Sequence, residues 1–407
     1  MKDERRRVVI TGLSVIAGNG KNKEEFKENC SRGISGLGRC TLFPTEKLRT
    51  SWFGQVEEHL VYEGNSWKEK DRMEALMEKA LVQLYQDASY SRGQMRELGR
   101  RSCLCLGTLL APTGKIMAYA RREQQGEREN GWLAHTVDYG TWLRKNSGVK
   151  GGIYIDSAAC ASGTTAVGMA YDFIKNGLYD VALAGGADPL TEVSAFGFHA
   201  LQSLSTGICR PFDCERDGIN IGEGAAFFLL ETEAHARERK AKIYGEVLGY
   251  GLNNDAYHIT SPDPEGEGAA TSMKQALAAG GIEMSQVDSV NAHGTGTPVN
   301  DVMEVKAMET VFAKRKEPLE VNSTKALTGH CMGASGAVEL AALLLEMESG
   351  WLHPMPNLEH PMPLPKEVRI SREGRECQVQ YALSNSFAFA GNTASLLIGN
   401  WKDTQVV

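Results

Sequence analysis

Short apolar runs alternate with longer amphipathic stretches along most of this chain. The runs that predict β-strands lie at 7–13, 151–158, 180–187, 288–294 and 319–324. Apolar positions at helical spacing predict helices at 72–86, 164–177, 303–312 and 336–350. Such alternation is typical of β-α-β units, so we expect an α/β fold with a largely parallel sheet covered by helices on both faces.

Two segments interrupt this pattern. Residues 120–140 are polar, charged and poorly periodic, so we expect an insertion or loop there. Residues 352–365 contain five prolines, which are incompatible with a regular helix or a central strand. We expect that segment to be an extended surface connection.

An internal similarity predicts two related halves. Segments 159–177 and 332–350 align over 19 residues without a gap, and each has Ala-Ser-Gly near its start and a final glycine, which is common after a helix. We place the division near residue 240, giving halves at 1–240 and 241–407. Cys160 aligns with Gly333, so only the first half has a thiol at this predicted strand-to-helix turn.

Composition and charge narrow the class of protein. A chain of 407 residues is longer than one hydrophobic core usually serves, which indicates about two domain-sized units. The 42% of hydrophobic residues indicates a folded protein. The net charge of −7 argues against broad nucleic-acid binding, and no stretch approaches the roughly 20 apolar residues of a membrane span. Nine cysteines without a CxxC pair indicate reduced thiols, so we expect a cytoplasmic protein.

Cys160 is the first candidate for chemistry, because it lies among small residues just before a predicted helix. A helix N-terminus lowers a thiol's pKa below its usual value of about 8.5, and its free N–H groups can bind an oxyanion. The alternative is a buried structural thiol.

Polar groups in the second half strengthen the catalytic interpretation. His293 precedes a glycine-rich turn with Thr295 and Thr297, where a phosphate loop is the weaker alternative because no lysine follows the glycines. Lys325 and His330 share the loop that leads into the second repeated helix. No H-E-x-x-H or CxxC spacing predicts a metal site, and a cysteine protease would not account for two histidines and a lysine.

Four motifs together resemble the elongating β-ketoacyl-acyl carrier protein synthases, which are condensing enzymes of the thiolase fold. They are "ACASG" at 159–163, "NAHGTGTP" at 291–298, "STKALTGHCMGASGAVE" at 323–339 and "SNSFAFAGNT" at 384–393. The resemblance covers almost all of the chain except about 95–140. It implies two duplicated halves in a layered α-β-α-β-α architecture and a decarboxylative condensation of an acyl primer with malonyl-acyl carrier protein, without a cofactor or a metal.

The resemblance assigns a role to each catalytic candidate. Cys160 would carry the acyl primer as a thioester, while His293 and His330 would bind the malonyl carbonyl and promote decarboxylation. Lys325 would support the environment of His330, with Glu339 as its charge partner. The alternative is a non-catalytic subunit that serves only for interaction with a partner. Non-catalytic subunits of this family characteristically lose the nucleophile, so the presence of Cys160 argues against that alternative.

The resemblance also implies binding roles and partners. Thr295 and Thr297 would line the pantetheine path of the carrier protein. The N–H groups of Cys160 and Phe389 would form the oxyanion hole, and the Phe389 side chain would gate the acyl pocket. We expect a homodimer, or a heterodimer with a homologous chain-length factor.

Two features set this chain apart from the family pattern. Ala388 and Ala390 stand where flexible glycines usually flank the gate, so the alanines either stiffen the gate or simply pack a hairpin. Together with the divergent segment 95–140, they favour a specialised fatty-acid, polyene or polyketide pathway. For docking of an acidic carrier protein we expect a local basic patch at Lys68, Lys70 and Arg72.

Overall fold

A mixed β-sheet organises the molecule. The computed structural model describes residues 6–56, 71–126 and 138–401. Within these residues, an 11-stranded sheet has the order β12-β10-β9-β14-β15-β8-β1-β7-β6-β4-β5. Its central strand β1 (Val8–Ala17) is buried at every position, which explains the nearly continuous apolar run at the start of the chain.

The first half supplies one end of this sheet and most of the helices near it. Its elements are β1, α1 (Lys23–Ser31), β2 (Gly38–Arg39), β3 (Trp52–Phe53), α2 (Arg72–Asp87), α3 (Arg92–Glu97), η1 (Gly99–Arg101), β4 (Ser102–Gly107), α4 (Thr113–Gln124), α6 (Tyr139–Ser147), β5 (Ile153–Asp156), η2 (Ala159–Ala161), α7 (Ser162–Lys175), β6 (Val181–Asp188), α8 (Glu192–Ala200), β7 (Gly224–Thr232) and α9 (Glu233–Glu238).

The second half supplies the other end of the sheet. Its elements are β8 (Gly245–Asn254), α10 (Glu267–Gly280), η3 (Met284–Gln286), β9 (Ser289–Asn291), α11 (Pro298–Phe312), β10 (Leu319–Asn322), α12 (Lys325–Thr328), η4 (Met332–Ala334), α13 (Ser335–Ser349), β11 (Trp351–Leu352), β12 (Val368–Ile370), β13 (Arg375–Glu376), β14 (Tyr381–Phe387), η5 (Phe389–Gly391) and β15 (Asn392–Asn400).

The two halves have matching strand orders. In the first, β5-β4-β6-β7-β1 has β7 antiparallel to both of its neighbours, and in the second, β10-β9-β14-β15-β8 has β15 antiparallel to both of its neighbours. The halves join where β1 pairs with β8, from Val8 opposite Val247 to Ile10 opposite Gly245. The sheet is therefore continuous across the expected division. Its central pairings, from β14 with β15 to β7 with β6, are antiparallel, so the expectation of a largely parallel sheet is wrong.

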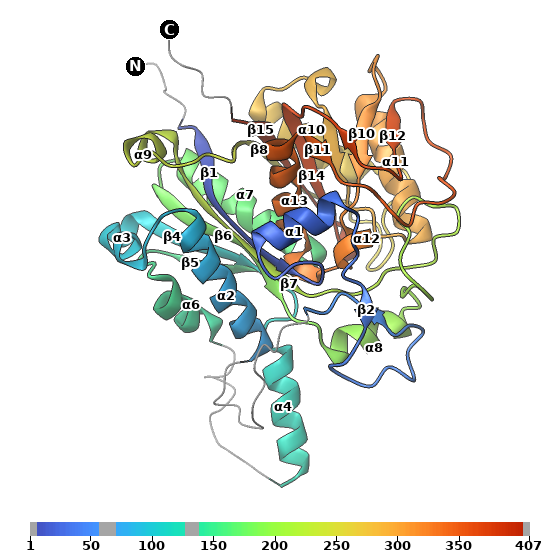
Figure 1. The fold of residues 1–407 in the computed structure, drawn as a ribbon, viewed down its shortest axis with the longest axis horizontal. Helices are drawn as coiled ribbons and strands as arrows, with labels where there is room; N and C mark the ends of the chain where they lie inside the picture. Colours follow the sequence, from blue (N-terminus) through green and yellow to red (C-terminus); the bar gives the residue numbers. More distant parts are fainter. Residues whose placement is uncertain (1–5, 57–70, 127–137, 402–407) are drawn as a thin grey trace.

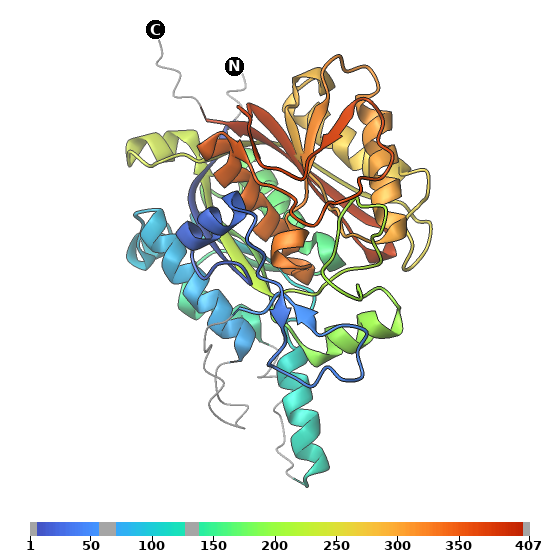
Figure 2. The ribbon, with the colours of Figure 1, turned by 45° about the vertical axis from the view of Figure 1, so that its right-hand side comes forward.

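The sheet and its helices form successive layers (Figures 1 and 2), and buried apolar side chains fill the spaces between them. Leu104 and Leu106 of β4 pack with α2 and α6 on one face of the first-half strands. Cys103 and Cys105 of the same strand pack on the other face, in the core that contains α7 and α13. The far face of the second-half strands packs against α10 and α11. The expected α-β-α-β-α layering is confirmed, and alternation along β4 shows its physical basis.

Both segments that interrupt the sequence pattern differ from expectation. Residues 120–124 complete helix α4, which projects from the body in Figures 1 and 2, rather than forming a loop, while residues 127–137 of the expected insertion lie outside the described residues. The proline-rich connection is irregular as expected, but it is not confined to the surface, because His353, Met355 and Leu358 are buried. Among the described residues, no helix is long and apolar enough to cross a membrane.

Candidate active site

Cys160 lies in a strained turn between β5 and α7. The preceding residue, Ala159, has φ of +51°, and Met332, its counterpart in the second half, has φ of +52°. A positive φ costs a non-glycine residue roughly 1–2 kcal/mol. Because both turns adopt it, the aligned segments share an unusual backbone as well as a sequence pattern, and the tight turn brings Cys160 to the start of α7.

Burial dominates the electrostatics of this thiol. Cys160 is only 5% exposed, and burial raises its pKa to about 12, although the nearby charge of Lys325 opposes the shift. The direction is opposite to the one expected from the helix N-terminus, because loss of solvation outweighs the charge of Lys325. The thiol is therefore protonated at rest, and its proton must leave when an acyl group is transferred to sulfur.

His293 follows β9 and is held from two sides. The carboxylate of Glu304 accepts the backbone N–H groups of His293 and Gly294 at 2.8 and 2.7 Å. The Lys325 ammonium lies 3.2 Å from the imidazole Nδ1. Because an ammonium only donates, Nδ1 accepts this hydrogen bond and the proton of the neutral ring is on Nε2.

His330 has the same tautomer through different partners. The backbone N–H of Met332 donates to its Nδ1 at 3.2 Å, and the hydroxyl of Ser335 lies 2.8 Å from the same atom. Since a backbone amide only donates, Nδ1 carries no proton in the neutral ring. The available N–H donor is again Nε2.

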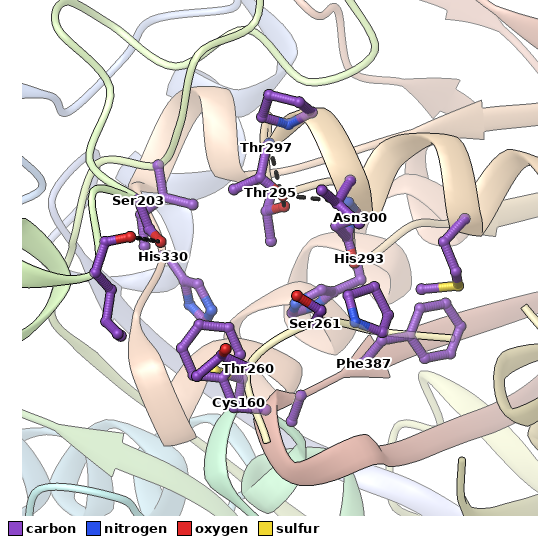
Figure 3. Close-up of a pocket in the computed structure, with 18 of the residues that line it drawn as sticks. Cys160, Ser203, Thr260, Ser261, His293, Thr295, Thr297, Asn300, His330 and Phe387 are labelled. Carbon is purple, nitrogen blue, oxygen red and sulfur yellow. Dashed lines mark hydrogen bonds between the residues drawn. The ribbon is translucent and has the colours of Figure 1, made fainter. Parts of the chain in front are cut away.

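The two imidazoles lie together beside the thiol. Their ring centroids are 5.5 Å apart and their planes are nearly perpendicular, at 84°. Burial, with the charge of Lys325, holds the pKa of both His293 and His330 well below the usual value, so both rings are neutral near pH 7. Both line, with Cys160, a cavity of about 310 Å³ (Figure 3).

Lys325 is buried and fully engaged. Its ammonium donates to the His293 carbonyl at 2.5 Å and to a Glu339 carboxylate oxygen, in addition to contacting His293 Nδ1. Glu339 is therefore its charge partner, as expected. Lys325 was expected to support His330, but its hydrogen bonds go to His293, and only its charge acts on His330.

Thr295 and Thr297 line the same cavity beyond His293. Their hydroxyl oxygens lie 2.9 Å apart. Thr297 is also the N-cap of α11, where its side chain accepts the N–H of Asn300, and Pro298 occupies the first helical position. The two threonines thus form one wall of the cavity on a backbone that the helix start holds in place (Figure 3).

Phe389 also lines the cavity, and it stacks on Phe198 of α8 with ring centroids 5.6 Å apart and planes at 20°. Its neighbours differ in backbone conformation. Ala388 is extended, with φ of −123°, whereas Ala390 is left-handed, with φ of +59°. Ala390 therefore occupies a conformation that favours glycine, while Ala388 does not.

The predicted docking patch is only partly described. Lys68 and Lys70 lie outside the described residues. Arg72 is mostly buried and binds the fully buried carboxylate of Glu223 and the carbonyl of Val56. This placement gives Arg72 a role in holding α2 against the core, because its charge is already paired.

Sequence reasoning missed residues that shape the site without reacting. Glu304 holds the backbone of the His293 turn, Ser335 and Met332 set the tautomer of His330, and Phe198 contacts the gate. Ser335 lay within a quoted motif, but nothing in the spacing showed which ring atom it contacts. In the part of the chain that the structure describes, no group of three or more His, Cys, Asp or Glu side chains is placed to hold a metal ion.

Comparison with known proteins agrees with this geometry. Residues 5–236 match the family described as "Beta-ketoacyl synthase, N-terminal domain", and residues 244–359 match "Beta-ketoacyl synthase, C-terminal domain". The chain is 32% identical to 3-oxoacyl-[acyl-carrier-protein] synthase 2 of Staphylococcus aureus (strain COL), covering 97% of this chain and 98% of that protein. The chloroplastic synthase II of Arabidopsis thaliana is also 32% identical, over 98% of this chain and 76% of that protein.

Solved structures show the same relationship. The ishigamide ketosynthase/chain length factor matches with a TM-score of 0.87 and 31% identity, covering 98% of this chain and 100% of that one. A type II polyketide synthase acyl-carrier protein in complex with its ketosynthase matches at 0.88 and 30%, with the same coverage. The chain belongs to the β-ketoacyl synthase family and has its thiolase-like fold. It is an acyltransferase of the β-ketoacyl-acyl carrier protein synthase type, which catalyses condensation in chain elongation.

Proposed function

We propose that Cys160, His293 and His330 carry out the two half-reactions of a decarboxylative condensation. In the first, the Cys160 sulfur takes the acyl group from a carrier-protein thioester, and the thiol proton leaves to the departing pantetheine sulfur. In the second, malonyl-carrier protein binds in the vacated cavity and reacts with the acylated cysteine.

The observation that carries this proposal is the matched tautomer of the two histidines. Loss of CO₂ breaks a C–C bond of the malonyl group and places its electron pair on the thioester oxygen as an enolate. Two Nε2–H donors from neutral imidazoles stabilise that oxygen without a permanent charge. The enolate carbon then attacks the acyl carbonyl on Cys160, a new C–C bond forms, and the sulfur leaves as a thiolate that takes up a proton.

Phe389 and the threonines complete the proposed site. The backbone N–H groups of Cys160 and Phe389 bind the oxyanion formed when the acyl carbonyl is attacked, and the Phe389 side chain gates the acyl pocket. Thr295 and Thr297 line the pantetheine path. The shared cavity of these residues supports the assignment, since a substrate in it contacts all of them.

The partners follow from the same chemistry. We propose acyl- and malonyl-loaded carrier proteins as substrates, and either a homodimer or a heterodimer with a homologous chain-length factor, as in the complexes that this chain resembles. The pathway is fatty-acid or polyene/polyketide elongation in the cytoplasm. We further propose that halves 1–240 and 241–407 arose by duplication, which their matching strand orders support.

Cys160→Ala tests the proposal directly. We expect this variant to form no acyl-enzyme by intact-mass analysis with acyl-carrier protein, yet to release CO₂ from malonyl-carrier protein, because both histidines remain. Cys214→Ala, which removes an exposed thiol, is the control and should acylate normally. A full acyl adduct on Cys160→Ala would refute the role of the thiol, and absence of malonyl-dependent CO₂ release from the unaltered protein would refute the role of the histidines.

A further inference from the structure

Helix α13 carries two buried glutamates, Glu339 and Glu346, that lie about two turns apart on the helix and so face the same way. Glu339 is accounted for by its ion pair with Lys325. Glu346 is just as deeply buried, at 5% exposed, and the reaction described above does not use it. A buried carboxylate is costly unless it is hydrogen-bonded, so its partners indicate what it is for.

Glu346 holds the end of β10. Its Oε1 accepts the side-chain amide of Asn322 at 2.6 Å and the backbone N–H of His353 at 2.8 Å. Its Oε2 has no hydrogen-bond partner among the residues that the structure describes. Asn322 is the last residue of β10 and lies three positions before Lys325. Glu346 therefore holds the end of the strand that leads to Lys325.

His353 closes a second connection. Its Nδ1 lies 3.0 Å from the carbonyl of Pro354, which only accepts, so Nδ1 carries a proton, and its Nε2 lies 3.7 Å from Glu346 Oε1. Nε2 lies 3.4 Å from the hydroxyl of Thr324, and that hydroxyl accepts the side-chain amide of Asn291 at 3.0 Å. Thr324 directly precedes Lys325, and Asn291 precedes His293 by two residues.

These contacts form one buried network behind the active site. Asn291, Asn322 and Thr324 are all buried, and they lie on the two strand ends that carry His293 and Lys325. Small displacements there change the distance between the ammonium and the imidazole Nδ1. Breaking any one of these hydrogen bonds would leave a buried polar group unpaired, which is costly, so the contacts restrict the positions of the two strand ends.

We propose that Glu346 and His353 are positioning residues that set Lys325 against His293 by holding Asn322 and Thr324. This inference rests on the proposed role of His293 and on the hydrogen bond that the Lys325 ammonium makes to His293 Nδ1. Glu346 lies on α13 and His353 in the proline-rich connection, and neither side chain lines the substrate cavity.

The test compares Glu346→Ala with Glu346→Gln. Alanine removes both hydrogen bonds at Oε1, whereas glutamine keeps an acceptor oxygen there. Because displacement of catalytic groups by about 1 Å costs on the order of a hundredfold in rate, we expect Glu346→Ala to lower kcat for malonyl-carrier protein decarboxylation about tenfold to a hundredfold. KM and the acylation rate of Cys160 should change much less, and Glu346→Gln should restore kcat towards the wild-type value.

Glu348→Ala is the matched control, because Glu348 lies on the same helix but pairs at the surface with Lys27 and Lys242. It should leave both half-reactions unchanged. If Glu346→Ala does not fold, Asn322→Ser removes the amide from the other side and should show the same selective loss. Equal loss of decarboxylation and acylation in Glu346→Ala, or no loss of either, would overturn the positioning role. Decarboxylation by the wild-type protein tests the proposed function separately, because it does not depend on the outcome for Glu346→Ala.

Discussion

The buried pair of Lys325 and Glu339 makes a prediction that separates charge compensation from simple packing. The side chains are 1% and 2% exposed, so water does not screen their interaction. We consider Lys325→Met, Glu339→Gln and the double variant. Each single change leaves one polar partner in the core without its ion pair, whereas the double change removes both charges at similar volume.

The expected magnitude follows from this burial. Removing one member of a buried ion pair costs about 3–5 kcal/mol, while replacing both members is often close to neutral. The double variant should therefore be more stable than the sum of the single effects predicts, and no less stable than Lys325→Met. All three variants should lose decarboxylation activity. Lys325→Met and the double variant remove the ammonium that donates to His293 Nδ1, and Glu339→Gln removes the carboxylate that holds this ammonium.

The pH dependence has a definite sign. Burial already raises the pKa of Glu339 above its usual value, and loss of the Lys325 charge raises this pKa further. A carboxyl whose pKa is raised by folding contributes its full stability below its unfolded pKa of about 4.3, and that contribution falls as pH rises through the folded pKa. Lys325→Met should therefore be more strongly destabilised at pH 8 than at pH 5.

Urea denaturation of all three variants at pH 5 and pH 8 is the assay. The control is Lys306→Met, which breaks the exposed pair of Lys306 with Glu265 and should cost about 0–1 kcal/mol. Additive effects of the two single changes, or equal destabilisation of Lys325→Met at both pH values, would refute the argument from a buried charge pair.

Three further predictions concern the histidines, the gate and docking. Because the pKa of both site histidines is lowered, the decarboxylation rate should stay level from pH 8 to pH 6; a fall centred near pH 6.5 in the rate profile would contradict neutral rings. Ala390→Gly should raise the free energy of unfolding by about 1 kcal/mol and Ala388→Gly should lower it, because only Ala390 has a left-handed backbone conformation. The double glycine variant should accept a wider range of primers in single-turnover acylation, and an unchanged primer profile would exclude the gating idea. Reversing the charges of Lys68 and Lys70 should raise the apparent KM for carrier-bound substrate and flatten its salt dependence, whereas Arg72→Glu should mainly destabilise the fold by leaving a buried carboxylate unpaired.

Local sequence patterns predicted much of the architecture. The fully buried strand β1 appears as an apolar run, and helices α7 and α13 appear as stretches with apolar positions at helical spacing and matching ends. The projecting end of α4 was not predicted, because its apolar residues do not recur at helical spacing and none of the helix's side chains is buried. A helix without a buried face lacks the signal on which pattern reasoning depends.

The residue types at the candidate site could likewise be found from motifs, but their physical states could not. The thiol's raised pKa arises from burial by neighbours distant in sequence, and helix position alone pointed in the opposite direction. Lys325 lies close to His330 along the chain, yet its ammonium bonds to His293, because β9 and β10 are adjacent strands. Adjacency in a sheet is a property of the folded chain.

The amino-acid sequence by itself determined the alternation of strands and helices, the repeated turn, and the presence of Cys160, His293, Lys325 and His330 within recognisable motifs. These features depend on local periodicity and residue identity, which are read along the chain. Tertiary structure alone decided the neutral state of the histidines and the network through Glu346. Hydrogen-bond partners and loss of water come from residues that only folding brings together, so distances and burial, rather than composition, set the chemistry of the site.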